Sequence, residues 1–161
     1  MATPTYTLID SVTLGSSAST VTFSSIPAGG DLVIVMTGQT TDGANCTFRI
    51  NSDTGNNYSY VYMRGDGSAA FSTSTGASDS NYVGYLTANP LNAILQFADY
   101  SATDKHKSSL VRTNDPSARV FAIANRWANT AAINRIDFIL SGGESFAAGM
   151  TFYLYDIAKA L

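Results

Sequence analysis

The side chains that could carry acid–base or metal chemistry are few and lie far apart in this sequence. The single histidine, His106, lies in the charged segment 104–107, and the single cysteine, Cys46, alternates with Phe48 and Ile50. A zinc site needs several Cys or His ligands, and a serine nucleophile of the hydrolase type lies in a Gly-x-Ser-x-Gly turn. The sequence offers neither pattern. We therefore predict no enzyme activity, no metal and no cofactor, with His106 in a solvated loop and Cys46 buried as a small apolar residue.

Two short motifs suggest ligands but fit turns better. Residues 51–57 alternate oxygen-bearing side chains, as calcium loops do, but Asp53 is their only acidic residue and no distal Glu follows. We interpret them as a turn in which Asn and Asp side chains bond their own backbone. The tripeptide Arg64-Gly65-Asp66, which integrins recognise in other contexts, is interpreted as a tight turn in which glycine supplies a positive φ.

Tyrosines provide the candidate contact residues. Tyr58, Tyr60 and Tyr62 share one face of an extended segment, where they could anchor a partner or stack on sugar rings. The alternative is packing in the core, between subunits or in cross-strand aromatic pairs, and we favour core or subunit packing. Tyr153 and Tyr155 complete the candidate interface.

Period-two alternation of apolar residues predicts that strands position these side chains. In the first strand we expect Tyr6, Leu8, Val12 and Leu14 to share one face. Residues 65–80 are predicted to form a long loop with at most a short strand near Ala70 and Phe71, and residues 125–134 are the best candidate for a helical turn. The expected strands cover residues 6–14, 21–23, 32–36, 46–50, 58–62, 81–87, 92–99, 107–113, 118–127, 134–140 and 150–157.

These short strands, separated by turn residues, predict an all-β protein. We expect an antiparallel β-sandwich, jelly-roll-like, in which residues 1–161 form a single domain and residues 1–5 an extended N-terminal arm. The formal net charge is −3 and the Lys and Arg residues are scattered, which argues against binding to nucleic acid or to an anionic membrane. No signal peptide precedes the first strand, and no apolar run approaches the ~18 residues that span a bilayer.

Residues 150–157 are apolar on both faces of the predicted strand. One face can serve the core, and the other requires a partner. The segment therefore predicts a homo-oligomer with closed symmetry, the alternative being a loop that covers the second face.

Several segments together resemble small structural proteins of tailed bacteriophages, notably marine phages and cyanophages. Residues 51–60 carry the resemblance together with Arg64-Gly65-Asp66-Gly67. Residues 6–14, 23–27, 127–133 and 151–157 fit the same set, so the resemblance spans nearly the whole chain. Asp156 stands where glycine is expected in the closing motif. The motifs are structural, so the resemblance implies no catalytic residues.

The resemblance implies a virion protein that is assembled in the host cytoplasm and displayed on the particle surface. Our leading hypothesis is a capsid decoration (cement) protein, with a trimer favoured, that bridges neighbouring major capsid proteins. The short chain has no coiled-coil or β-helical shaft, which favours cement over fibre. The alternative is a tail or head fibre module that binds host glycan or receptor through Tyr58, Tyr60, Tyr62 and residues 65–80. A hydrolase is the third and least favoured class.

Overall fold

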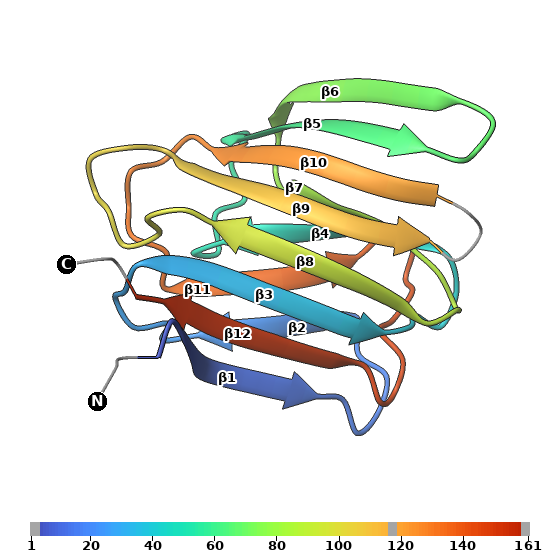
Figure 1. Ribbon diagram of the computed structural model, residues 1–161, viewed down its shortest axis with the longest axis horizontal. Helices are drawn as coiled ribbons and strands as arrows, with labels where there is room; N and C mark the ends of the chain where they lie inside the picture. Colours follow the sequence, from blue (N-terminus) through green and yellow to red (C-terminus); the bar gives the residue numbers. More distant parts are fainter. Residues whose placement is uncertain (1–3, 116–118, 159–161) are drawn as a thin grey trace.

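Alternating apolar side chains build the two layers of the protein. The computed structural model describes residues 4–115 and 119–158, and within them every regular element is a strand (Figure 1). No helix in these ranges could cross a membrane. The strands are β1 (Tyr6–Thr13), β2 (Thr20–Ser24), β3 (Asp31–Gly38), β4 (Ala44–Ile50), β5 (Tyr58–Gly65), β6 (Ala70–Ser78), β7 (Asn81–Leu86), β8 (Leu91–Phe97), β9 (Lys107–Asp115), β10 (Arg119–Trp127), β11 (Arg135–Leu140) and β12 (Thr151–Ile157).

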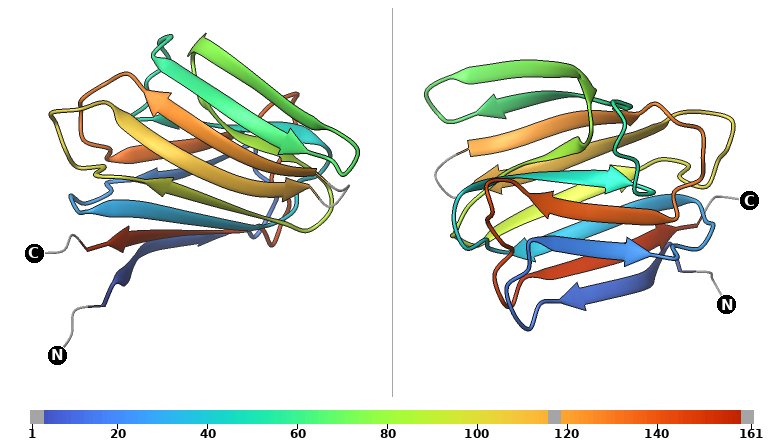
Figure 2. Two further views of the ribbon diagram at one scale, coloured as in Figure 1. Left: turned by 45° about the horizontal axis from the view of Figure 1, so that its top comes forward. Right: turned by 180° about the vertical axis from the view of Figure 1, so that it is seen from behind.

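Two antiparallel sheets pack face to face. The larger has eight strands in the order β1-β12-β3-β8-β9-β10-β5-β6, and the smaller has four in the order β2-β11-β4-β7. Figure 2 shows the smaller sheet from behind, lying across the larger one. The predicted all-β, jelly-roll-like sandwich is confirmed.

Aromatic rings fill the space between the sheets. Phe48 of β4 lies at their centre, with its ring centroid 5.5 Å from that of Phe97 and 6.2 Å from that of Phe138. Phe152 of β12 extends the cluster at 5.6 Å from Phe138. Cys46 is buried beside them, and burial raises the pKa of its thiol. The predicted burial of Cys46 as a small apolar residue is confirmed, and both sheets share one continuous core.

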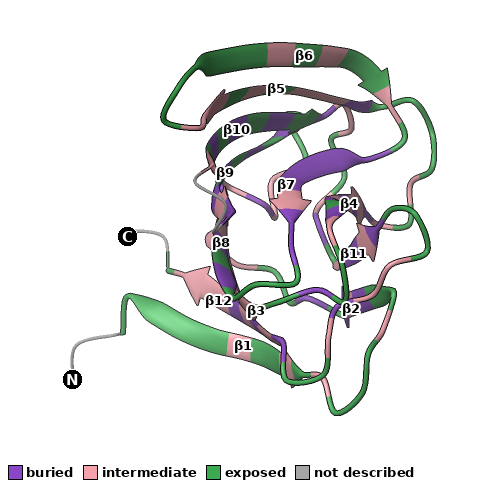
Figure 3. Cartoon of the chain, turned by 90° about the vertical axis from the view of Figure 1, so that its right-hand side faces the viewer, coloured by how far each residue is buried: buried purple, intermediate pink, exposed green. Residues whose placement is uncertain are grey.

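Strand β6 corrects the prediction of a long loop over residues 65–80. It pairs only with β5, at the edge of the larger sheet, and most of its side chains are exposed (Figure 3). A strand without a buried face needs no apolar alternation, so its Ser- and Thr-rich sequence gave no period-two signal. The helical turn expected over residues 125–134 is also wrong, because residues 125–127 end β10 and residues 128–134 are irregular.

A β-bulge corrects the expected face of the first strand. The pairing of β1 with β12 shifts between Leu8 and Asp10, so one extra residue of β1 lies between them. Leu8 therefore stands opposite Tyr155 on one face, whereas Val12 stands opposite the buried Phe152 on the other. Of the proposed N-terminal arm, residues 1–3 lie outside the described residues.

One side chain links the two sheets at the free edge of β7. The Oδ1 atom of Asn125, in β10, accepts a hydrogen bond from the Tyr82 N–H at 3.0 Å. The Nδ2 atom of Asn125 donates to the Tyr82 carbonyl at 3.2 Å. A single buried amide thus satisfies both backbone groups of Tyr82, as a neighbouring strand would.

Candidate docking surface

The solvent-directed face of the eight-stranded sheet, here called the outer face, carries the most unusual surface of the molecule. Residues opposite one another in antiparallel strands lie on the same side of a sheet. One row across the outer face consists of Leu8, Tyr155, Val33, Gln96, Leu110, Ala124, Val61 and Ser74. The next row consists of Ser11, Tyr153, Val35, Ile94, Arg112, Ala122, Met63 and Ser72.

Large apolar side chains are exposed along both rows. Leu110 is 61% exposed, Met63 60% and Val61 50%. Val120, beside the second row on β10, is 62% exposed. Contiguous exposed apolar surface on a soluble protein usually marks an interaction site, and that is how we interpret the outer face.

The corresponding face of the four-stranded sheet has a different character. Thr22 donates a hydrogen bond to Asp137 at 2.6 Å, and Asp137 also pairs with Arg135 at 2.7 Å. Arg49 forms an ion pair with Asp79. Polar and paired charged groups of this kind suit contact with water, so the two sides of the sandwich differ sharply.

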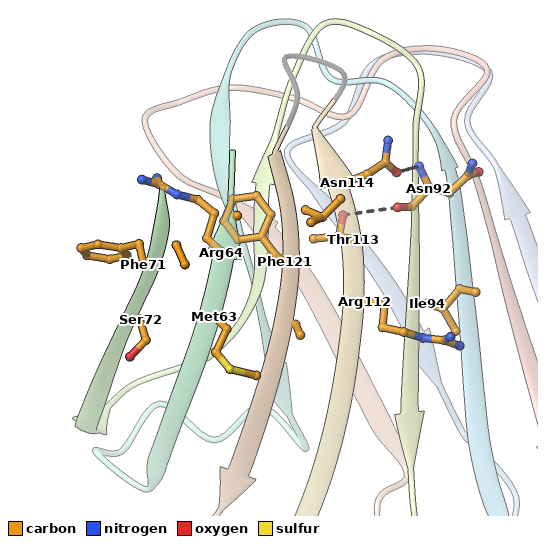
Figure 4. A pocket seen from close by; sticks show the side chains of 14 residues that line it. Met63, Arg64, Phe71, Ser72, Asn92, Ile94, Arg112, Thr113, Asn114 and Phe121 are labelled. Atoms are coloured by element: carbon orange, nitrogen blue, oxygen red, sulfur yellow. Dashed lines mark hydrogen bonds between the residues drawn. The ribbon is translucent and has the colours of Figure 1, made fainter. Parts of the chain in front are cut away.

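Three hollows between described residues open on the outer face. The largest, of about 920 Å³, crosses β6, β5, β10, β9 and β8, and is here called the Arg112 groove (Figure 4). The other two, of about 480 and 360 Å³, lie beside Leu110 and Val61. At one end of the groove the Asn114 side chain accepts a hydrogen bond from the Asn92 N–H at 3.1 Å, which holds β8 and β9 in register (Figure 4).

The structure places Tyr58 in the core and the other four candidate tyrosines on opposite sides of the larger sheet. Tyr58 is buried, stacks on Trp127 and donates to the carbonyls of Ile50 and Asp53 at 3.2 and 3.1 Å. A contact role for Tyr58 is therefore wrong, and the core-packing alternative is confirmed.

The other four tyrosines lie on opposite sides of the larger sheet. Tyr60 and Tyr62 pack inward on Tyr82, each with its ring centroid 5.4 Å away. Tyr153 and Tyr155 lie on the outer face, where their rings stack at 6.3 Å and the ring of Tyr6 meets Tyr155 edge-on.

The sequence-based list of contact residues missed Val61, Met63 and Leu110. The signal was present in β5, where Val61 and Met63 alternate with tyrosines, so the strand is apolar on both faces. A strand of that kind in a two-layer sandwich leaves one apolar face without a covering layer.

The suspected calcium loop is a turn. Asp53 accepts hydrogen bonds from the Gly55 N–H at 2.8 Å, the Asn57 amide at 2.9 Å and the Trp127 indole N–H at 2.7 Å. Its carboxylate is thus used within the protein, and the interpretation as an Asx turn is confirmed. In the described ranges, no three His, Cys, Asp or Glu side chains come together as metal ligands.

The turn at residues 64–67 also follows the prediction. Gly67 has a φ of +84°. The Asp66 carboxylate accepts hydrogen bonds from the backbone of Ser68 at 3.1 Å and of Ala69 at 2.9 Å. Asp66 therefore caps its own turn.

Asp53 should make the protein sensitive to acid. Burial opposes ionisation of Asp53, but the Trp127, Asn57 and Gly55 donors outweigh it and lower its pKa below 3.8. A carboxyl whose pKa is lower in the folded state stabilises the fold above its unfolded-state pKa, and this contribution is lost as pH falls through the folded-state value. We expect Asp53→Asn to cost about 1–2 kcal/mol at pH 6, because charged hydrogen bonds are lost, and less at pH 3.

Urea unfolding at both pH values measures this difference. Asp104→Asn, at an exposed position of the β8–β9 loop, is the matched control and should change little at either pH. Added calcium should leave the melting temperature of the wild type unchanged. A cost of Asp53→Asn that is the same at pH 3 and pH 6 would contradict the assignment.

Comparisons with known proteins are sparse. No family model matches the chain, and no curated protein matches its sequence. Among solved structures, the fold is similar to alginate lyase Aly36B, at 12% identity and a TM-score of 0.40, covering 91% of this chain and 76% of that chain. A double variant of that lyase in complex with alginate trisaccharide is similar at 10% identity and a TM-score of 0.40, covering 94% and 80%. These likenesses are too distant to assign an activity.

Proposed function

We propose that the protein is a non-enzymatic structural component of a tailed-phage virion, and specifically a capsid decoration protein that docks on the major capsid protein. The observation that carries this proposal is the contrast between the two sides of the sandwich. The outer face exposes large apolar side chains, with Arg112 and Arg126 among them, whereas the smaller sheet presents paired charges and hydroxyls. A part that lies on a protein shell needs one face for the shell and one for water.

The size of the outer face suits this role. Eight strands spaced by about 4.8 Å span roughly 34 Å, and seven residues at about 3.4 Å each span roughly 24 Å. The product, on the order of 800 Å², equals the area that one partner contributes to an interface of standard size. The outer face as a whole therefore offers about one partner's share of a standard interface, which the shell and a neighbouring subunit would divide between them.

The fibre alternative is weakened at its three tyrosines, although strand β6 remains mostly exposed. Tyr58 lies in the core, Tyr60 and Tyr62 pack on Tyr82, and most of residues 65–80 form strand β6. We favour the decoration role for this reason. A homo-oligomer, with a trimer favoured, would use Tyr153 and Tyr155 at the β1–β12 end of the outer face and leave the β8–β6 end for the shell.

Variants on the two sides of the sandwich test the docking role. Leu110→Asp places a charge at the centre of the outer face, and Thr20→Asp places the same charge on the exposed polar side. Because Leu110 is exposed, both variants should keep the wild-type melting temperature. Binding to purified capsids that lack decoration protein should weaken by roughly tenfold or more for Leu110→Asp, since a charge at the centre of an apolar interface must be desolvated. Thr20→Asp should bind as the wild type does.

Sedimentation of labelled protein with capsids gives the occupancy, and imaging of labelled virions gives the location. Equal capsid binding by both variants would exclude the outer face as the docking surface. Labelled protein at the tail tip instead of the shell would replace the decoration role by the fibre role.

A further inference from the structure

The arginines of this protein fall into two sets that differ in their partners. Arg49 and Arg135, on the polar side, and Arg119, in β10, each pair with an aspartate. The remaining three, Arg64, Arg112 and Arg126, have no carboxylate within ion-pair distance in the part of the chain that the structure describes. Arg112 and Arg126 lie on the outer face and line two of its hollows, whereas Arg64, opposite Phe121 and Phe71, lies on the other side of β5 and reaches only the rim of the Arg112 groove. Two of the three arginines thus place positive charge on the apolar side.

Arg112 occupies a central position in this set. Its neighbours across the strands are Ile94 of β8 and Ala122 of β10, so its position in the sheet has an apolar residue on each side. Figure 4 shows its side chain lying over β8, toward Ile94. At the opposite side of the groove, Arg64 lies over the ring of Phe71, 5.2 Å from its centroid.

The lining of the Arg112 groove combines positive charge with an aliphatic floor. Met63, Ile94, Val120 and Ala122 form the floor, and none of the described residues that line the groove is Asp or Glu. Asp66, two residues from Arg64, is outside the lining and caps its own turn. In a protein with a net charge of −3, this groove is a local region of positive charge.

We propose that the Arg112 groove binds an extended peptide segment in which Asp or Glu alternates with aliphatic residues, and that Arg112 is the anchor for its carboxylate. The inference rests on the proposed docking role and specifies the chemistry of the partner. A guanidinium binds a carboxylate through two parallel hydrogen bonds. Arg112 is exposed in the free protein, and the aliphatic side chains of the bound segment would exclude water around the pair and strengthen it.

The floor of the groove favours a peptide over other anions. Sugar rings and nucleobases bind by stacking on aromatic faces, but Met63, Ile94, Val120 and Ala122 offer aliphatic surface and Phe71 lies at the rim, already covered by Arg64. Aliphatic side chains of a peptide bury apolar area on such a floor. A nucleic acid would also need a longer track of positive charge than these arginines supply.

Selection from a random peptide library on the immobilised protein tests the inference. Enriched peptides should be rich in Asp or Glu spaced among Leu, Ile, Val or Phe.

Fluorescence anisotropy of a labelled enriched peptide then measures the effect of Arg112→Glu, which should weaken binding by roughly tenfold or more because an attractive pair becomes repulsive. Arg126→Glu makes the same charge change on the same face, outside the groove, and should alter binding less than about twofold because solvent and salt screen it. Arg112→Lys should bind with intermediate affinity, since lysine keeps the positive charge but cannot form two parallel hydrogen bonds with a carboxylate.

Three outcomes would overturn the inference. They are enrichment without an excess of acidic residues, equal loss of binding for Arg112→Glu and Arg126→Glu, and Arg112-dependent binding of a single-stranded oligonucleotide or a polyuronate without any acidic peptide being enriched. The result is independent of the capsid assay. Capsid binding that survives Arg112→Glu would leave the docking role intact, and acidic-peptide binding without capsid binding would leave the groove assignment intact.

Discussion

Replacing Lys107 with methionine should lower the free energy of unfolding by about 3 kcal/mol, because it leaves buried carbonyl groups without donors. The Lys107 side chain is almost fully buried at the start of β9. Its ammonium donates to the carbonyls of Ala102 at 2.5 Å, Lys105 at 3.1 Å and Thr130 at 3.1 Å. One cation thus holds the β8–β9 loop against the β10–β11 loop. Methionine has a similar volume, so the loss reports the hydrogen bonds and not a cavity.

Lys105→Met is the matched control for this prediction. Lys105 is 52% exposed and pairs with Asp99 at 2.6 Å. Exposed ion pairs contribute less than about 1 kcal/mol, so this variant should unfold nearly as the wild type does. Denaturant unfolding of both variants measures the difference in the free energy of unfolding. Similar losses for the two variants would contradict the prediction, because they would show that water forms hydrogen bonds with the three carbonyls when the Lys107 ammonium is removed.

Gly84→Ala should destabilise the protein by about 3 kcal/mol, for two separate reasons. Gly84 has a φ of +139°, which side-chain-bearing residues rarely adopt and which costs on the order of 1–3 kcal/mol. A Cβ atom at Gly84 would also lie 2.4 Å from Cγ2 of Thr113, in β9 of the facing sheet. Relieving such a contact in a packed interior costs about 1–3 kcal/mol. Gly84 is therefore a position at which β7 and β9 lie too close together to accommodate a Cβ atom.

A second variant separates the two contributions. Thr113→Ser removes the methyl group that a Cβ at Gly84 would contact. In that background, Gly84→Ala should lower the free energy of unfolding only by the cost of the unusual φ, without the cost of the steric contact. Gly15→Ala, at a position with open space around the added methyl and no unusual φ, should change stability by less than about 0.5 kcal/mol. Calorimetric melting of the wild type, the three single variants and the double variant measures these differences. A Gly84→Ala variant as stable as Gly15→Ala would show that β7 can shift away from β9.

Sequence reasoning succeeded where one face of a strand is buried and the other is not. In β4, Cys46, Phe48 and Ile50 alternate with polar residues, and the structure buries all three. It failed at β6, where exposure on both faces removes the alternation. It also failed at β1, where a bulge changes the face without leaving a sequence signal.

The docking surface was less predictable than the fold. Alternation shows that Tyr58, Tyr60 and Tyr62 share a face, but only the packing of the sheets decides that this face is the inner one. The Arg112 groove combines β8, β9 and β10 with β5 and β6, which are distant in sequence. Its shape depends on strand order, which local sequence patterns do not specify.

The Asn125 amide has a consequence for solubility at high concentration. The free edge of a β-sheet is a template on which another chain can add a strand, and repeated addition leads to filaments. At Tyr82 both backbone groups are occupied by the Asn125 side chain, and both hydrogen bonds are buried between the sheets. The larger sheet therefore covers this part of the β7 edge, and an added strand would first have to displace Asn125.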